Sequence, residues 1–393
     1  MGQWNEAKIG EIAEVKGGKR IPKGRKLIKE PNSHPYIRIR NLGKTKYMQL
    51  NTDYEYVDEE TQQMIARYIV NQGDILISVV GTIGLVGIVG NTLDKANQTE
   101  NCDKIINIKK VLSEYLYYYL VSSFGQDEIK KGTVGAVQPK LPLKNVKDII
   151  VKYPPIKEQK QIVEILSAID EKIELNETIN NNLLQQLHVL YLRLFCDSAM
   201  DTPLGDVVAT TSGGTPSRKH DEYYSDSSIC WVKSKELLGN YIHETEEHIN
   251  DLAIKKSSAK LLPEHSVLIA MYGATVGAYG VISKPMTCNQ AVCALLCNEN
   301  YPYTYLFQIA YESQQKFINL AVGSAQQNIS QVLIKHLNLH SDLDIIQKFH
   351  GFALPMHKEI ESLQAENMRL SALRDNLLPK LMSGELDVSN IDL

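Results

Sequence analysis

Two stretches of the chain carry apolar residues at alternating steps of three and four. The first covers 162–194, and adding 187 to each of its positions gives the second, 349–381. A 3.5-residue period over about four heptads predicts a coiled-coil seam. The predicted seam residues are Ile162, Leu166, Ile169, Ile173, Asn176, Asn180, Leu183 and Leu187, with Met356, Ile360, Leu363, Asn367, Leu370 and Leu377 in the second stretch.

The simplest partner for each of these helices is the other one. Each seam helix is roughly 50 Å long and must bury its apolar stripe. A globular stretch separates them along the chain, which permits an antiparallel pair. Positions whose numbers sum to about 543 are then level, so Asn176 lies beside Asn367. Such a polar pair fixes the register at a cost in stability, although seam asparagines can also be merely tolerated.

The globular stretches repeat as well, with an offset that drifts from 196 to 187. The matching segments are 9–12 with 204–207, Gly17-Gly18 with Gly213-Gly214, 79–87 with 272–280, Asn97-Gln98 with Asn289-Gln290, and 133–141 with 321–329. A single glycine pair can mark a turn and nothing more. Five matches in the same order, followed by heptads in phase, predict two pseudo-symmetric units.

Each globular stretch reads as strands broken by glycines and followed by a helix. The expected elements are a strand at 36–42, two strands joined through GTIG within 68–93 and a helix at 112–124, with counterparts at 231–237, 265–282 and 304–318. Regular βαβ alternation is missing, so the predicted class is α+β. We expect a first globular domain at 1–153, a long helix at 154–198, a second globular domain at 199–343, and a second long helix with the C-terminal tail at 344–393.

The net charge of −4 argues against a nonspecific nucleic-acid binder, but its distribution is uneven. Residues 1–153 hold 23 Lys and Arg against 17 Asp and Glu, a balance of +6. Seven of these cations lie within 16–29, and Arg38 and Arg40 follow, alternating with isoleucines. A basic, glycine-rich loop beside two arginines on one strand face suits phosphates or base edges. A solvated charged loop is the alternative.

No chemistry of an enzyme or of a metal site is evident in the sequence. A GxxxxGK[ST] loop is missing, and YPPI at 153–156 lacks the flanking residues of an amino-methyltransferase motif. The six cysteines form no CxxC pair, and the histidines at 220, 243, 248 and 265 have no zinc-ligand spacing. No apolar run reaches about 18 residues and the N-terminal segment has no apolar signal core, so we expect a cytoplasmic protein.

Three segments together resemble one family, the specificity subunits of type I restriction–modification systems. They are LGDVVATTSGGTPS at 204–217, YPPIKEQKQIVEIL at 153–166 and LLPKLMSGEL at 377–386. The resemblance covers almost the whole chain, and its motifs are modest singly and specific jointly. The second repeat departs from the first at 340–349, where the Pro-Pro and Glu-Gln are lost, and Arg374 occupies a seam position. Both departures bear on the symmetry of partner docking.

The resemblance implies a subunit without catalysis of its own. Each globular unit would be a target-recognition domain for one half of a bipartite, asymmetric site in double-stranded DNA. The helices would act as a ruler between the halves. We expect two modification (methyltransferase) subunits to dock on the helices. Restriction (endonuclease) subunits, where they exist, would join this complex. S-adenosylmethionine, ATP and Mg²⁺ would belong to those partners, and this chain would bind no cofactor.

The expected DNA-binding residues follow from matching loops of the two units. They are Gly17, Gly18, Lys19, Arg20, Lys23, Arg38, Arg40, Gln138 and Lys140 in the first, and Gly213, Gly214, Thr215, Ser217, Arg218, Lys219, Lys233, Lys235, Gln326, Gln327 and Asn328 in the second. Glycine lets backbone N–H groups approach phosphate, and amide side chains suit purine edges. Each glutamine or asparagine can equally be an ordinary turn residue. A scaffold for two ligands other than DNA and a methyltransferase with intrinsic activity remain open as other functions.

Overall fold

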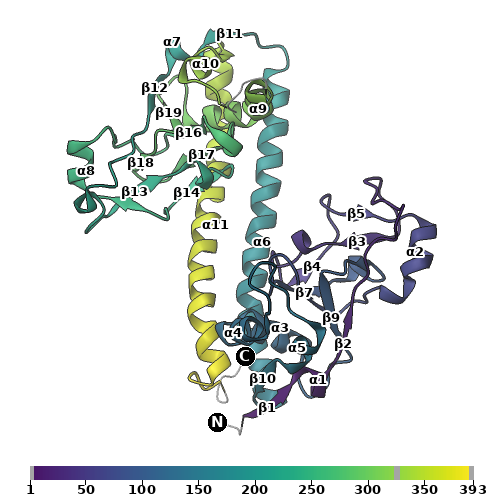
Figure 1. Ribbon diagram of the computed structural model, residues 1–393. Coiled ribbons are helices and arrows are strands. Elements are labelled where there is room, and N and C mark those ends of the chain that lie inside the picture. The colour runs from purple at the N-terminus through teal and green to yellow at the C-terminus, as the bar shows by residue number, and fades with distance from the viewer. Residues whose placement is uncertain (1–3, 323–327, 389–393) are drawn as a thin grey trace. The chain divides into compact units, whose positions relative to one another are not determined.

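A computed structural model describes residues 4–322 and 328–388 (Figure 1). The chain divides into two compact units. Unit 1 comprises Met1–Ile173 and Arg369–Leu393, and unit 2 comprises Glu174–Met368. This division cuts both long helices, α6 (Ile156–Phe195) and α11 (Leu343–Ser383), so each unit holds one segment of each helix. The domain boundaries predicted from the sequence follow the elements instead, and they stay a prediction.

The described residues of unit 1 form three sheets. The five-stranded sheet has the order β2 (Glu14–Gly17), β9 (Cys102–Ile106), β6 (Ile75–Ser78), β7 (Val86–Val89) and β4 (Tyr47–Met48). A three-stranded sheet has the order β5 (Glu55–Tyr56), β3 (Pro35–Ile37) and β8 (Asn97–Gln98), and β1 (Asn5–Lys8) pairs with β10 (Ile150–Tyr153). The short helices are α1 (Ile9–Ile12), α2 (Glu59–Ile65), α3 (Ser113–Val121), α4 (Ser123–Gly132) and α5 (Leu143–Asp148), with 3₁₀ turns at Ile39–Asn41, Ala66–Tyr68 and Asn91–Leu93.

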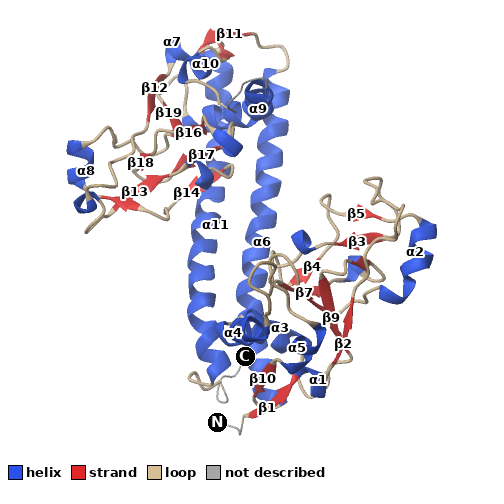
Figure 2. Cartoon of the chain, in the orientation of Figure 1, coloured by secondary structure: helices blue, strands red, loops and turns tan. Residues whose placement is uncertain are grey.

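Unit 2 repeats this topology strand for strand. Its five-stranded sheet has the order β12 (Ala209–Ser212), β19 (Val292–Leu296), β16 (Val267–Ala270), β17 (Tyr279–Ile282) and β14 (Asn240–Ile242). The smaller sheets are β15 (His248–Ile249), β13 (Ile229–Val232) and β18 (Thr287–Cys288), and β11 (Met200–Pro203) with β20 (Asn338–His340). The helices are α7 (Leu204–Val207), α8 (Asp251–Lys256), α9 (Tyr303–Val322) and α10 (Gln331–Lys335), with 3₁₀ turns at Asp221–Tyr223, Ser234–Glu236 and Gly273–Thr275. The predicted repeated α+β class is confirmed (Figure 2).

Alternate side chains of the central strand β6 enter two different cores. Ile75 and Ile77 pack with Tyr115 and Leu116 of α3, whereas Leu76 packs on the opposite face of the sheet. All five side chains are buried or nearly so, which explains why this strand reads as a continuous apolar run. In unit 2 the strand β16 repeats the arrangement, with its residues divided in the same way between two cores.

The predicted helix at 112–124 is two helices in the structure. The chain is extended at Ser122, whose hydroxyl accepts a hydrogen bond from the N–H of Gly125 and so begins α4. A Cβ on Gly125 would lie 2.2 Å from the carbonyl oxygen of Tyr119, so glycine permits the close packing at this break. The predicted helix at 304–318 is a single helix, α9.

Both units contain an antiparallel pair of long-helix segments. In unit 1 the guanidinium of Arg374 lies 3.1 Å from the carboxylate of Asp170, and in unit 2 the amide of Asn176 donates to Asn367 at 2.8 Å. The residue numbers in these pairs sum to 544 and 543, which is the register expected for two antiparallel seams. Every predicted seam residue is buried or half-buried. Within the described residues, none of the helices combines the length and apolarity that crossing a membrane requires.

Candidate nucleic-acid interface

Each unit holds its glycine loop against an aromatic residue of the middle strand of the three-stranded sheet. In unit 1 the hydroxyl of Tyr36 on β3 donates to the carbonyl oxygen of Lys19 at 2.9 Å. In unit 2 the indole N–H of Trp231 on β13 donates to the carbonyl oxygen of Gly214 at 3.0 Å. Adding 195 to the numbers of Tyr36 and Lys19 gives Trp231 and Gly214, so the two glycine loops occupy equivalent places.

Close packing requires glycine at Gly18 in unit 1 and at both Gly213 and Gly214 in unit 2, where a Cβ on Gly214 would lie 2.3 Å from the backbone nitrogen of Ala259. A Cβ on Gly18 would lie 2.0 Å from the carbonyl oxygen of Thr99, and a Cβ on Gly213 would lie 2.1 Å from that of Cys288. Both obstacles are backbone atoms, which cannot rotate away. The N–H of Gly18 donates to the carbonyl of Cys102, and that of Gly213 donates to the equivalent carbonyl of Val292. Gly18 therefore corresponds to Gly213, and the predicted match of Gly17 with Gly213 is wrong by one residue. Gly17 ends β2 and faces Asp103 in the ladder.

The two predicted arginines do not lie on one face of a strand. The strand β3 ends at Ile37, and residues 39–41 form a 3₁₀ turn. The turn forms because the N–H of Arg38 donates to the side chain of Asn41 at 2.8 Å, and the N–H of Asn41 donates back to the carbonyl of Arg38. Unit 2 has the same turn, in which the N–H of Lys233 donates to the carboxylate of Glu236. We call 38–41 and 233–236 the cation turns.

An acidic residue ties the cations together in each unit. Glu55 accepts from Arg38 at 2.6 Å and from Arg40 at 3.0 Å, both at Oε2. In unit 2 Glu247 forms ion pairs with Lys233 and Arg218. The hydrogen bond from Lys233 lowers the pKa of the Glu247 carboxyl, against the effect of partial burial. The sequence reasoning missed both acids, although an offset of 192, within the drift of the repeat, relates them.

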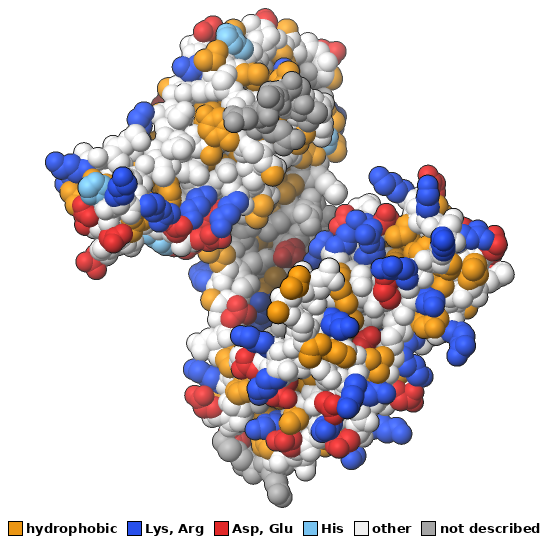
Figure 3. Space-filling view, viewed as in Figure 1, with side chains coloured by type: hydrophobic (Ala, Val, Ile, Leu, Met, Phe, Trp, Pro, Cys, Tyr) orange, Lys and Arg blue, Asp and Glu red, His pale blue; other side chains and the backbone are white. Residues whose placement is uncertain are grey.

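The remaining predicted cations lie at the surface of the same loops. The guanidinium of Arg218 stacks 4.4 Å from the ring centroid of Tyr224, which fixes its position. Arg20 pairs with Glu100 at 2.6 Å, and Lys235 pairs with Glu246. The predicted cations Lys23 and Lys219 are exposed, as are the predicted polar residues Thr215 and Ser217. Basic and acidic side chains alternate along the edge of unit 2 that carries β13 and β14 (Figure 3).

Backbone hydrogen bonds join the other predicted loops to the glycine loop in a fixed order. Lys19 N–H donates to the carbonyl of Gln98, Val79 N–H to that of Asn101, and Leu141 N–H to that of Val79. Unit 2 repeats this series, with Gly214 donating to Cys288, Met271 to Ala291, and Ile329 to Met271. The glycine loop, the segment before β9, the GxxG turn and the glutamine loop therefore form one continuous row in each unit.

The glutamine loops end this row. Gln138 is exposed, and Lys140 pairs through its backbone with Val134 and Val80. Asn328 forms the equivalent bridge with Tyr272. Gln326 and Gln327 lie outside the described residues.

The predicted match of Asn97-Gln98 with Asn289-Gln290 is wrong by two residues. In the parallel ladders Tyr36 faces Asn97, whereas Trp231 faces Thr287. Asn289 corresponds to Thr99 instead, because the N–H of Thr99 donates to the carbonyl of Ile37 and the N–H of Asn289 donates to the equivalent carbonyl of Val232.

One group of side chains in unit 2 offers metal-ligand atoms close together, which the sequence spacing did not indicate. Atoms of Cys230, Glu244 and His248 all lie within 4.8 Å of one another. The Glu244 carboxylate is already paired, because Lys284 Nζ lies 3.2 Å from its Oε2. Burial opposes its ionisation, but hydrogen bonds from Cys230 and His248 help lower its pKa to about 2. The lysine supplies the positive charge that a metal ion would otherwise bring.

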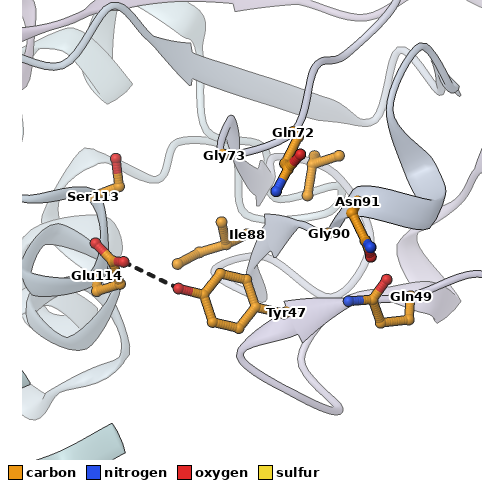
Figure 4. Close-up of a pocket in the computed structure, with 10 residues that line it drawn as sticks. Tyr47, Gln49, Gln72, Gly73, Ile88, Gly90, Asn91, Ser113 and Glu114 are labelled. Atoms are coloured by element: carbon orange, nitrogen blue, oxygen red, sulfur yellow. Dashed lines mark hydrogen bonds between the residues drawn. The ribbon is translucent and has the colours of Figure 1, made fainter. Parts of the chain in front are cut away.

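A separate hollow of about 390 Å³ lies at the β4–β7 edge of unit 1 (Figure 4). Tyr47 donates to Glu114 at 3.0 Å across it, and the amides of Gln49, Gln72 and Asn91 line it. Its lining contains none of the predicted DNA-binding residues.

Comparison with known proteins gives consistent matches along the chain. A family model described as the type I restriction modification DNA specificity domain matches residues 1–185 and 199–341. The chain is 26% identical to the type I restriction enzyme MjaIX specificity subunit of Methanocaldococcus jannaschii, over 99% of this chain and 94% of that protein. It is 22% identical to the HindI specificity subunit of Haemophilus influenzae, over 98% and 100%. The solved S subunit from M. genitalium has a similar fold, with a TM-score of 0.58 at 15% identity over 97% of this chain and 96% of that one.

Proposed function

Because this chain belongs to the family of type I restriction–modification DNA specificity subunits, we propose that its two units read the two halves of a split DNA target. The observation that carries the proposal is the repetition of one row of loops on two identical topologies. In both units the row starts at a glycine loop beside a cation turn. Cations and exposed polar side chains in such loops suit phosphates and base edges.

The two units would read different sequences, because the side chains at equivalent positions differ. The cation turn of unit 1 carries Arg38 and Arg40, whereas that of unit 2 carries Lys233 and Lys235. A guanidinium can bind guanine with two hydrogen bonds in a plane, whereas an ammonium acts as a point charge. We therefore expect an asymmetric target.

The chain would act without catalysis of its own. Methyltransferase subunits, and endonuclease subunits where they exist, would dock on it and bring S-adenosylmethionine, ATP and Mg²⁺ with them. The long helices would serve as the ruler between half-sites, since a rigid rod of roughly 1.5 Å per residue sets a distance along the duplex.

Methylome sequencing tests this function directly. The chain is expressed with and without the methyltransferase subunit encoded beside it, in cells that lack other adenine methylation. Methylated adenines in a split, asymmetric motif, present only when both proteins are present, are the expected result. Methylation with this chain alone would mean intrinsic catalysis. No methylation with a competent partner, or a palindromic motif, would contradict the proposal.

A further inference from the structure

We propose that Glu55 and Glu247 are selectivity residues, which hold the cations of each recognition site in place and discourage binding to DNA of the wrong sequence. The inference deepens the proposed function and rests on it. It concerns how each unit separates its own half-site from the excess of other DNA.

The two acids occupy the same place in the two units. Glu55 pairs with Tyr36 in the antiparallel ladder between β5 and β3. The N–H of Trp231, which corresponds to Tyr36, donates to the carbonyl oxygen of Glu247 at 3.1 Å. Each carboxylate thus starts next to the aromatic residue that holds the glycine loop, and it reaches the cation turn. Chance surface ion pairs have no reason to recur at one topological position.

Each acid contacts two cations. In unit 2 the side chain of Arg218 is 57% exposed and that of Lys233 is 20% exposed, and in unit 1 both cations are accessible. The side chain of Glu55 is 21% exposed, whereas those of Arg38 and Arg40 are 45% and 52% exposed. Arg40 also donates to the carbonyl oxygen of Asp53 at 2.9 Å, and it borders an open hollow of about 490 Å³ together with Glu55. A guanidinium has five N–H donors, so these contacts leave several donors of Arg38 and Arg40 for DNA.

The acid has opposite effects on the two kinds of contact with DNA. A phosphate that approaches the pair meets a negative charge, and the cations are already partly neutralised, so attraction to the backbone alone is weakened. A base edge carries no net charge and gains from a guanidinium whose orientation is fixed beforehand. Affinity for the phosphate backbone is the same for every DNA sequence. Lowering it therefore raises the ratio of the affinity for the cognate site to the affinity for other DNA.

The test compares charge-removing variants of the full chain, assembled with its methyltransferase subunits. Glu55→Gln and Glu247→Gln keep the shape of the side chain and remove its charge. Asp148→Asn is the matched control, because it removes one charge from an ion pair with Lys8 at the β1–β10 sheet. Binding to a duplex with the methylome motif and to a scrambled duplex is followed by fluorescence anisotropy from 50 to 200 mM salt, after circular dichroism has verified folding.

We expect each glutamine variant to bind the scrambled duplex about three- to tenfold more tightly at the lower salt concentration. The slope of its log affinity against log salt should steepen by about 0.9, the value for one further neutralised phosphate. The affinity for the duplex with the methylome motif should rise less, so the ratio of this affinity to that for the scrambled duplex should fall. The glutamine variants of the two units test the idea independently, which covers the case in which one of them fails to fold.

Three results would overturn the inference: an unchanged ratio, an equal effect of Asp148→Asn, or a parallel loss of binding to both duplexes. If the wild-type complex itself does not distinguish the duplexes, the proposed function fails instead.

Discussion

The pair of amide side chains between the long-helix segments of unit 2 offers a quantitative test. Asn176 is fully buried and donates to Asn367 at 2.8 Å and to the carboxylate of Glu366 at 2.7 Å. The first is a neutral hydrogen bond of about 0.5–1.5 kcal/mol, and the second, to a charged group, contributes about 1.5–3 kcal/mol. Asn176→Ala should therefore lower the free energy of unfolding of unit 2 by about 2–4 kcal/mol. Asn367→Ala should cost only about 1 kcal/mol, because this side chain is half-buried.

A double-mutant cycle isolates the amide–amide contact. The doubly substituted chain should lose about 1 kcal/mol less than the sum of the single losses, because the shared bond is counted twice in that sum. Trp4→Phe leaves Trp231 as the only tryptophan, so fluorescence during urea unfolding reports on unit 2. The exposed Asn181→Ala is the matched control and should change stability by less than about 0.5 kcal/mol. Additive losses in the cycle would refute the view that this pair stabilises the register.

Three further predictions concern stability, each measured by unfolding of the full chain. Gly213→Ala should destabilise unit 2 by about 1–3 kcal/mol, because the added Cβ would clash with backbone atoms. Gly351→Ala lies at an exposed, open position of a helix and should stabilise unit 2 by up to about 1 kcal/mol. Equal effects of the two substitutions would contradict the packing argument. Asp170→Ala should cost about 2–3 kcal/mol, because it removes the ion pair with Arg374 and the hydrogen bond that the buried Tyr118 hydroxyl donates to the carboxylate. A loss below about 0.5 kcal/mol would contradict this. Burial lowers the pKa of His357 to about 3, so the folded state favours the neutral ring. Above about pH 6.5 the ring is neutral in the unfolded chain as well, and protonation no longer reduces the free energy of unfolding. Stability should then fall by up to about 1.4 kcal/mol per unit as pH drops from 6.5 towards 3, and His357→Gln should flatten that slope.

The periodic parts of the fold could be predicted from the sequence alone. The seam step of three and four residues depends only on helix geometry, so the level pairing of Asn176 with Asn367 followed from counting. The strands on either side of GTIG could also be predicted, because β6 and β7 are buried and, apart from Ser78, contain no polar side chain. Local periodicity decides such elements before any long-range contact forms.

Contacts between distant segments could not be predicted in this way. The strand expected through Arg40 ends early because Asn41 bonds back to the chain, a choice that alternating letters do not reveal. Glu55 reaches the cation turn from a strand 17 residues away from Arg38, and nothing in its own segment points there. Letter matches between the repeats also failed where identical residues stand at positions that are not equivalent, and only the ladder pairing identifies the counterpart of Asn97.

Unit 1 is built from two separated parts of the chain, so its folding depends on residues that are synthesised last. Unit 2 is one continuous segment, and its core contains no residue of 369–388. Unit 1 has to wait, because Leu381, Met382 and Val388 belong to the same core as Ile9 and Ile12. Until those residues leave the ribosome, the apolar surface that they cover is open to chaperones and proteases. A chain that ends after residue 368 would thus have a complete unit 2 and an incomplete unit 1.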